Sequence, residues 1–348
     1  MKFIIVSRLE KIKNIDIVIK VFNKLKDDEL WIVGKGKYES ELKKLAKAKN
    51  IKFFGFVDEK TLKKLYKEAD VCIMPHINEP FGLVPYEIAK FGKPSIISKL
   101  SGIAELAKEY KFGLIFDPYD ENDLLEKIKT IKIKKIYKQL SRNANNLKKY
   151  INPNTEFKKF LEHIPKNTKR ILIIHSQFIE IGGAEKSIIG MYEKLKRIYN
   201  CEIYFEIDKN YKKWKILYKS KIRKIAYIFR IFNSLSNLIK KFKNNDIVIV
   251  SLTGNILSIP AYWSSLILGN LINKKIIIYL HEPPLSSWSI RKIEKILLFP
   301  IIFLDILLSK NLLRNNFTII ANSDFSKKYF IKRYKKAIKD IIYPIFHL

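Results

Sequence analysis

The sequence predicts an α/β protein with two domains, each built on a doubly wound parallel sheet. Over residues 1–165, short runs rich in β-branched residues alternate with longer stretches of helical periodicity, a pattern typical of parallel sheets covered by helices. The alternation stops at the polar segment Pro165–Lys169 and then restarts. Because 348 residues suit two ordinary domains, we expect the domains to cover residues 1–165 and 166–348.

The first domain is expected to contain six strands, each a short apolar run. They are Lys2–Ser7, Leu30–Val33, Lys52–Phe54, Val71–Met74, Pro94–Ile97 and Gly113–Phe116. The predicted helices between and after them are Ile15–Leu25, Tyr38–Ala48, Glu59–Glu68, Val84–Phe91, Asp123–Lys129, Tyr137–Tyr150 and Thr155–His163.

The second domain is expected to begin with the strand Arg170–His175, a Gly-Gly turn and a helix that ends near Arg197. The further predicted strands are Cys201–Ile207, Asp246–Ser251, Lys275–Leu280 and Phe317–Ala321.

The net charge of +33 departs most from an average composition, and residues 166–348 carry +21 of it. Most of the basic residues are Lys, a bias that nucleotide composition alone can produce. An Arg-poor chain is poorly suited to reading base edges. Since no nucleic-acid motif is present, we expect no nucleic-acid partner.

The cysteine usage and the apolar segments indicate a cytoplasmic location. Cys72 and Cys201 lie far apart, which suggests a reducing compartment without a disulfide framework. The start of the chain lacks the apolar core of a signal peptide. The longest apolar segment, Ile296–Leu308, is too short to span a bilayer and contains Asp305.

Two cations and two glycines follow the first two predicted strands. Arg8 and Lys13 come after the first strand, where ligands bind in open α/β sheets. They could hold a diphosphate, although taken alone they are better explained as solvated charges. Gly34 and Gly36 follow the second strand, where glycine permits either a tight turn or a close approach of the backbone to a ligand.

The most informative segment runs from Glu79 to Glu87 (EPFGLVPYE). A helix is predicted to begin near Gly82, and its free N–H groups would form an anion site. One carboxylate precedes this helix and the other lies inside it. Two acids are unfavourable for phosphate itself but suit hydroxyl groups, such as those of a sugar and a ribose.

These residues resemble the donor-binding, carboxy-terminal domain of the group 1 (family 4) retaining glycosyltransferases of the GT-B fold, which is built from two Rossmann-like domains. Glu79 through Glu87 reproduces the E-x7-E motif of that family. The other matching motifs occur in family order over residues 2–130: SRL…KN, VGKG, FFGFV, YKEADVCIMP, GKPSIIS, SGIAE and GLIFDPYD. Ser101 departs from the family pattern, which has glycine at that position.

Residues 166–348 resemble the acceptor-binding, amino-terminal domain of the same family through shorter motifs. Gly182 and Gly183 form its glycine turn, His281 follows a strand as in the family, and FTIIANSD matches a strand that ends in Asn-Ser. The family places this acceptor domain first, so the resemblance implies a circular permutation, a split tandem array or a mis-called reading frame.

The resemblance implies a retaining transfer of a sugar from a nucleotide-diphosphate sugar to a glycan or lipid-linked acceptor, without a metal or other cofactor. Glu79 and His281 would act on the donor sugar. Donor and phosphate binding would fall to Arg8, Lys13, Gly34, Gly36, Phe81, Gly82, Leu83, Glu87, Gly182 and Gly183, with Glu87 on the ribose. The alternative is a hybrid or fragment of tandem glycosyltransferases that binds a nucleotide but transfers nothing.

The segment Lys209–Asn245 contains 12 Lys or Arg residues, no acid and several interleaved aromatic residues. A basic helix with aromatic residues is typical of a membrane-surface element, and a solvated helix is the alternative. We therefore expect binding to an anionic membrane at its inner face.

Overall fold

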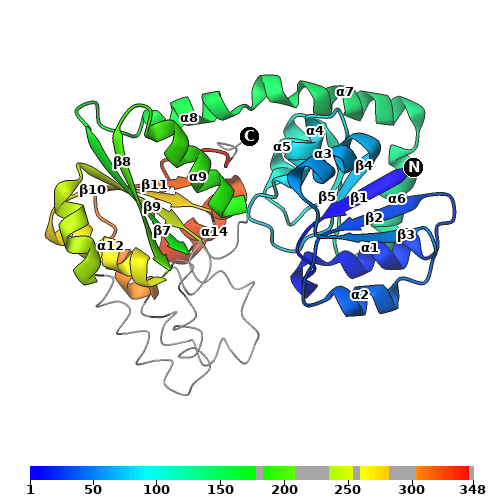
Figure 1. Cartoon of the computed structure of the whole chain (residues 1–348), viewed down its shortest axis with the longest axis horizontal. Coiled ribbons are helices and arrows are strands. Elements are labelled where there is room, and N and C mark those ends of the chain that lie inside the picture. The colour runs from blue at the N-terminus through cyan, green and yellow to red at the C-terminus, as the bar shows by residue number, and fades with distance from the viewer. Residues whose placement is uncertain (178–182, 208–234, 254–258, 282–302, 304, 345–348) are drawn as a thin grey trace, which may run out of the picture. The chain divides into compact units, whose positions relative to one another are not determined.

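The computed structural model describes residues 1–177, 183–207, 235–253, 259–281, 303 and 305–344. The chain divides into two compact units, Met1–Asn152 and Pro153–Leu348. Both carry a six-stranded sheet in which all pairs are parallel, so the predicted α/β class is confirmed. Figure 1 shows both units.

The first unit has the strand order β3-β2-β1-β4-β5-β6. Its strands are β1 Lys2–Val6, β2 Glu29–Val33, β3 Ile51–Gly55, β4 Val71–Met74, β5 Ser95–Ser98 and β6 Gly113–Phe116. Its helices are the 3₁₀ turn η1 Lys11–Lys13, α1 Ile15–Phe22, α2 Glu39–Leu45, α3 Glu59–Glu68, α4 Val84–Ala89, α5 Ile103–Glu109, α6 Glu121–Ile131 and α7 Lys134–Tyr150.

Helices cover both faces of this sheet, which explains its continuous apolar strands. Successive strand residues point to opposite faces. Accordingly, Phe3 and Ile5 pack in a core with residues of α1 and α6, whereas Ile4 packs with residues of α3 and α4.

Short polar side chains set the starts of two helices of the first unit. Asp58 accepts a hydrogen bond from the backbone N–H of Thr61 in α3. Asp120 accepts from the N–H groups of Asn122 and Asp123 in α6. Each cap satisfies N–H groups that have no partner inside the helix.

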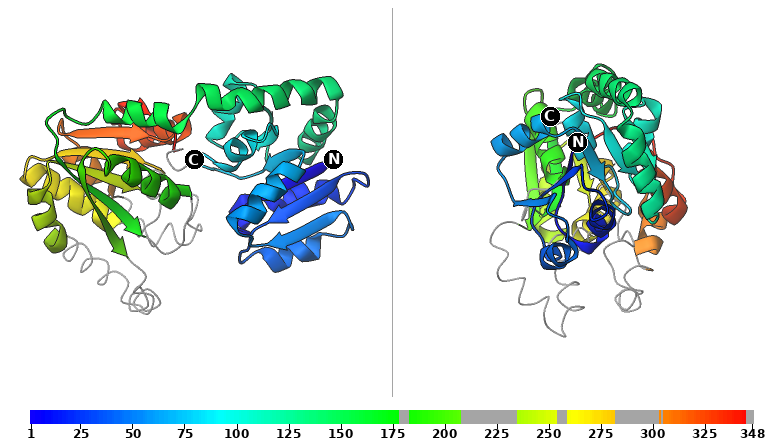
Figure 2. Two further views of the ribbon diagram at one scale, coloured as in Figure 1. Left: turned by 45° about the horizontal axis from the view of Figure 1, so that its top comes forward. Right: turned by 90° about the vertical axis from the view of Figure 1, so that its right-hand side faces the viewer.

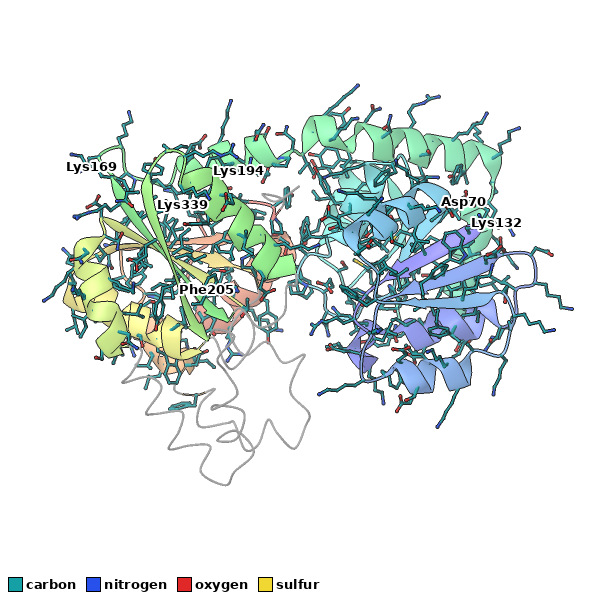
Figure 3. All side chains as sticks on the ribbon, viewed as in Figure 1. Asp70, Lys132, Lys169, Lys194, Phe205 and Lys339 are labelled. Atoms are coloured by element: carbon teal, nitrogen blue, oxygen red, sulfur yellow. The ribbon has the colours of Figure 1, made fainter. Side chains whose placement is uncertain are left out.

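Charged residues close the amino-terminal edge of the first sheet. The carboxylate of Asp70 accepts from the backbone N–H of Lys2 at 2.8 Å. Lys132 donates to the buried Asp28 at 2.7 Å. Figure 3 labels Asp70 and Lys132 at this edge, which lies opposite the edge where the predicted donor site is found.

The second unit has the strand order β12-β11-β10-β9-β7-β8. Its strands are β7 Arg170–Gln177, β8 Asn200–Ile207, β9 Ile247–Leu252, β10 Lys275–Leu280, β11 Phe317–Ala321 and β12 Asp340–Ile341. Its named helices are α8 Pro153–Leu161, α9 Gly183–Leu195, α12 Ile259–Leu271 and α14 Asp324–Tyr334. Residues of α8 and α9 pack on one sheet face and residues of α12 and α14 on the other, as Figure 2 also shows.

The boundary between the units lies after Asn152 and not after residue 165. The reason is that α8 belongs to the second core: Phe157, Phe160 and Ile164 are buried with Ile171 and Ile173 of β7. The sequence shows the polar joint at 165–169, which is only a turn within the second unit. The assignment of the units to donor and acceptor stays a prediction.

Candidate functional site at the carboxyl edge of the first sheet

The first sheet has a topological switch point between β1 and β4. These strands are neighbours, but the chain proceeds from β1 toward β2 and β3 on one side and from β4 toward β5 and β6 on the other. Ligands in open α/β sheets bind in the crevice outside the carboxyl ends of such strands. The loops that leave this point are residues 7–14 and 75–83.

These two loops bring Lys13, His76 and Glu79 into contact. The Nζ atom of Lys13 donates to Oε2 of Glu79 at 2.7 Å. Nδ1 of His76 lies 2.9 Å from the same oxygen. The side chains of Lys13 and Glu79 are 19 % and 18 % exposed, so both can be reached by a ligand. The structure thus pairs two predicted site residues and adds His76, which the sequence analysis did not single out.

The electrostatics of this cluster keep Glu79 charged. Burial by itself would raise the pKa of Glu79, but the charge of Lys13 and the hydrogen bonds from His76 and Lys13 hold the pKa well below its usual value. Burial and the positive charge of Lys13 lower the pKa of His76. At neutral pH the site therefore contains a carboxylate, an ammonium group and a neutral imidazole.

The backbone of the Glu79–Leu83 loop is fixed by the loop after β5. The N–H of Glu79 donates to Leu100 O, and the N–H groups of Gly102 and Ile103 donate to the carbonyls of Glu79 and Phe81. Ser101, the departure from the family's glycine, is compatible with this arrangement because its hydroxyl donates to Phe81 O at 3.1 Å.

Gly82 permits the turn into α4. It has a φ of +89°, and a Cβ atom there would lie 2.6 Å from the Met74 side chain. Helix α4 begins at Val84, two residues beyond Gly82, with Leu83 at its N-cap. The predicted start of the helix is therefore nearly correct. Anion binding at its N-terminus, with Phe81, Gly82 and Leu83, stays a prediction.

Gly34 and Gly36 are needed for a close approach of two loops. A Cβ atom at Gly34 would lie 1.9 Å from the Ser7 carbonyl oxygen, and one at Gly36 would lie 2.2 Å from that of Leu9. Their loop is joined to the Arg8 loop by the hydrogen bond from Leu9 N to Lys35 O. Because these two residues lack side chains, the turn after β2 can lie directly against the loop after β1.

Glu87 and Arg8 lie outside the Lys13–Glu79 contact. Glu87 accepts a hydrogen bond at 2.9 Å from the hydroxyl of Tyr66 on α3. Arg8 is 66 % exposed and donates to Glu10 at 3.1 Å. It is close enough for its charge to contribute to the lowered pKa of His76. Of the predicted residues, the structure brings Lys13 and Glu79 together and places Arg8 and Glu87 in separate pairs.

In the second unit, His281 lies directly after β10 and is buried. Its ring stacks edge-on against Tyr279 with centroids 4.8 Å apart, and its Nε2 has no hydrogen-bond partner among the described residues. Burial, together with the charge of His175, lowers the pKa of His281 to about 3. His281 is therefore neutral at physiological pH.

Three polar residues near His281 were not predicted as site residues. Nδ1 of His175, in β7, lies 2.8 Å from the Ser251 hydroxyl, and its Nε2 lies 3.5 Å from the carboxylate of Glu185 on α9. Glu185 and His175 are both among the charges that act on His281. In the sequence, His175 and Ser251 end predicted strands, and Glu185 lies in the glycine-turn motif GGAEK.

The remaining predictions fall partly outside the described residues. Gly183 is the first residue of α9, whereas Gly182 lies outside the described part, as do residues 209–234 of the basic segment. Within the described ranges, no three His, Cys, Asp or Glu side chains group closely enough to hold a metal ion. The same ranges contain no helix that is long and apolar enough to cross a membrane.

Comparison with known proteins gives a family match for the first unit. Residues 1–149 match the model of the family described as glycosyl transferases group 1. The match is confined to the first unit and covers less than half of the chain. An uncharacterized glycosyltransferase of Methanocaldococcus jannaschii is 33 % identical over 126 residues, which cover 34 % of this chain and 32 % of the relative.

Other relatives show the same partial coverage. The sulfoquinovosyl transferase of Arabidopsis thaliana is 30 % identical over 129 residues, covering 36 % of this chain and 25 % of the relative. Among solved structures, the Anabaena protein HepE in complex with UDP and glucose has a TM-score of 0.42 at 23 % identity, covering 46 % of this chain and 47 % of that one. The chain spans about a third or less of the length of these two curated relatives.

Proposed function

We propose that this chain is a retaining glycosyltransferase that moves a sugar from a nucleotide-diphosphate sugar to a glycan or lipid-linked acceptor. The observation that carries the proposal is the Lys13–Glu79 contact at the switch point of a sheet whose residues match the group 1 model. An ammonium group beside a carboxylate can take a diphosphate and a sugar hydroxyl at adjacent positions.

In the proposed donor site, basic and acidic side chains bind different parts of the ligand. Lys13 and Arg8 would bind the diphosphate, whose developing negative charge must be stabilised as the sugar leaves. Glu79 repels phosphate but accepts hydrogen bonds from sugar hydroxyls. Glu87, oriented by Tyr66, would accept from the ribose hydroxyls.

In this proposal the second unit supplies His281 and the acceptor site. A neutral imidazole whose buried Nε2 has no partner among the described residues is suited to hydrogen bonding with a sugar hydroxyl. The donor half would then precede the acceptor half, an order permuted relative to the family. The family match over residues 1–149 supports the placement of the donor half.

Nucleotide binding tests the donor site directly. Titration calorimetry with UDP and GDP should detect binding of at least one of them. Lys13→Ala and Glu87→Ala should each weaken that binding by about tenfold or more, because each removes a charged hydrogen-bonding group. Exposed Lys64 and Glu126 provide matched controls, since Lys64→Ala and Glu126→Ala should bind as the wild type does. A folded wild-type protein that binds neither nucleotide would contradict the proposal.

A transfer assay separates this function from the nucleotide-binding hybrid. If the chain is an enzyme, transfer or donor hydrolysis should depend on both Arg8 and His281. Nucleotide binding with no donor turnover would favour the hybrid.

We also propose that the basic segment Lys209–Asn245 binds an anionic membrane surface, because its composition supplies about 1 kcal/mol of attraction per nearby basic residue. Sedimentation with vesicles tests this: the protein should bind phosphatidylserine vesicles at low salt, and its binding should fall steeply with salt. Equal binding to neutral vesicles would count against it.

A further inference from the structure

His76 is a buried histidine in the donor-site loop, and the proposed function does not yet use it. It lies two residues after β4, it is 6 % exposed, and it contacts Glu79.

The carboxylate of Glu79 is held through one oxygen only. Lys13 and His76 both bond Oε2, at 2.7 and 2.9 Å. Within the described residues, Oε1 has no hydrogen-bond partner. Two donors on a single oxygen fix the carboxylate plane and leave the other oxygen available to accept from a ligand hydroxyl.

The two donors differ in what a diphosphate would do to them. Lys13 carries a charge, so a bound diphosphate competes with Glu79 for its ammonium group. His76 is neutral, because burial and Lys13 lower its pKa. A neutral imidazole bonded to a carboxylate through Nδ1 carries its proton there. A bound diphosphate therefore does not compete with Glu79 for the His76 hydrogen bond, which is retained.

We propose that His76 is a positioning residue, which keeps Glu79 oriented toward the donor sugar while Lys13 is engaged by the diphosphate. This inference rests on the proposed function, since it takes the ligand to be a nucleotide sugar. If the inference is correct, His76 contributes to binding of the sugar part of the ligand and not to binding of the nucleotide part.

Two variants at this position test the inference. His76→Ala removes the Nδ1 donor, whereas His76→Asn places an amide N–H close to where Nδ1 was. Calorimetry would compare a nucleoside diphosphate with its sugar conjugate, UDP with UDP-glucose or GDP with GDP-mannose, whichever pair the wild type binds.

We expect His76→Ala to weaken binding of the nucleotide sugar by about tenfold, because a hydrogen bond to a charged group is lost. Binding of the nucleoside diphosphate should change by less than about twofold, and His76→Asn should restore most of the sugar-dependent loss. Equal weakening of both ligands in His76→Ala, or no improvement in His76→Asn, would overturn the inference. Failure of the wild type to bind any nucleotide would instead contradict the proposed function.

Discussion

Glu79 couples the donor site to stability through its lowered pKa. Its carboxylate is charged in the folded state at pH values where an unfolded glutamate, with a pKa of 4.5, becomes protonated. The stabilisation is therefore complete above that value and is lost as the pH falls toward the native pKa.

Replacing Glu79 by Gln should remove this pH-dependent contribution. We expect Glu79→Gln to be less stable than the wild type at pH 7 and the difference to shrink as the pH falls from about 5 to 3. The free energy of unfolding of the first unit can be measured at each pH by urea unfolding, followed by pulsed hydrogen exchange of first-unit peptides. Glu126→Gln, at an exposed position, is the control, and a pH-independent difference for Glu79→Gln would contradict the expectation.

Gly34 combines a positive φ with a close backbone contact, and Gly55 has the positive φ alone. A Cβ atom at Gly55 would meet only the end of the Lys35 side chain, at 3.5 Å. Gly55→Ala should cost about 1–2 kcal/mol of unfolding free energy for its left-handed backbone. Gly34→Ala should cost about 1–3 kcal/mol more, because Ser7 must move. Equal losses in urea unfolding would show that the contact with Ser7 relaxes freely.

At the residue scale, the sequence predicted the Lys13–Glu79 region well but not its third member. Glu79 was identified because its spacing to Glu87 is a motif, and Lys13 because it follows a strand. His76 belongs to no such pattern, since its contact with Glu79 depends on the path of one short loop. His175, Ser251 and Glu185 were missed because only the sheet and α9 bring them together.

Helices α3 and α4 are linked at the site by the Tyr66–Glu87 hydrogen bond. Tyr66 is buried, and burial together with the charge of Glu87 raises the pKa of its hydroxyl well above the usual value, so it remains a donor. Tyr66→Phe should weaken nucleotide binding by about threefold to tenfold without unfolding the protein. Calorimetry measures the change. The control is Tyr137→Phe, which should have no effect on binding because the Tyr137 hydroxyl donates to the carbonyl of Asp70, at the opposite edge of the sheet from the donor site.

Asp305 explains why an acid interrupts the apolar segment Ile296–Leu308. It is fully buried and accepts hydrogen bonds from Trp263 at 3.0 Å, Tyr334 at 2.5 Å and Arg333 at 3.3 Å. In the sequence, this acid only counts against a membrane span. In the structure it joins the helical residues around it to α12 and α14.

Asp305→Ala should cost roughly 3–5 kcal/mol in the second unit, because the mostly buried guanidinium of Arg333 loses its carboxylate partner. Glu193→Gln, which breaks an exposed pair with Lys196, should cost less than about 1 kcal/mol. Hydrogen exchange of second-unit peptides provides the measurement. Similar losses in the two variants would show that the buried cluster adds no more than a surface pair.

At the element scale, all strands except the two-residue edge strand β12 were predicted, because both faces of each sheet are covered. Buried strands such as β4 and β9 consist almost entirely of apolar residues, and their predicted bounds match within a residue. Helices α5 and α14 were not assigned from the sequence. Helix α12 has apolar residues on most of its surface, so it lacks the polar face that marks a helix in a sequence.

At the scale of the whole molecule, the four hydrophobic clusters described above are each drawn from a single unit. A cavity in one core should therefore destabilise mainly that unit. Ile4→Ala and Ile278→Ala, both at fully buried positions, should each lower the stability of their own unit by about 2–5 kcal/mol. Peptide-level hydrogen exchange distinguishes the units, and equal loss of protection in both would contradict the expectation.

Two domains were predicted from the sequence, but their boundary was misplaced because it depends on contacts between residues far apart in the chain. A polar turn at 165–169 interrupts the hydrophobic pattern visibly. The true division follows α7, where only Ile151 and Asn152 separate α7 from α8 and the helical pattern is barely interrupted. Which core a helix joins depends on distant residues, here those of β7.

Asn14 adopts a left-handed conformation with φ +52° in the loop after β1, and its side-chain amide donates to the carbonyls of Pro75 and Pro118. One amide therefore ties together the loops that follow β1, β4 and β6. A nucleotide arriving at this edge would find its binding loops already ordered, so capture should proceed in a single step. In stopped-flow measurements the observed rate should rise linearly with nucleotide concentration, whereas Asn14→Ala should introduce a plateau set by slow ordering of the loops.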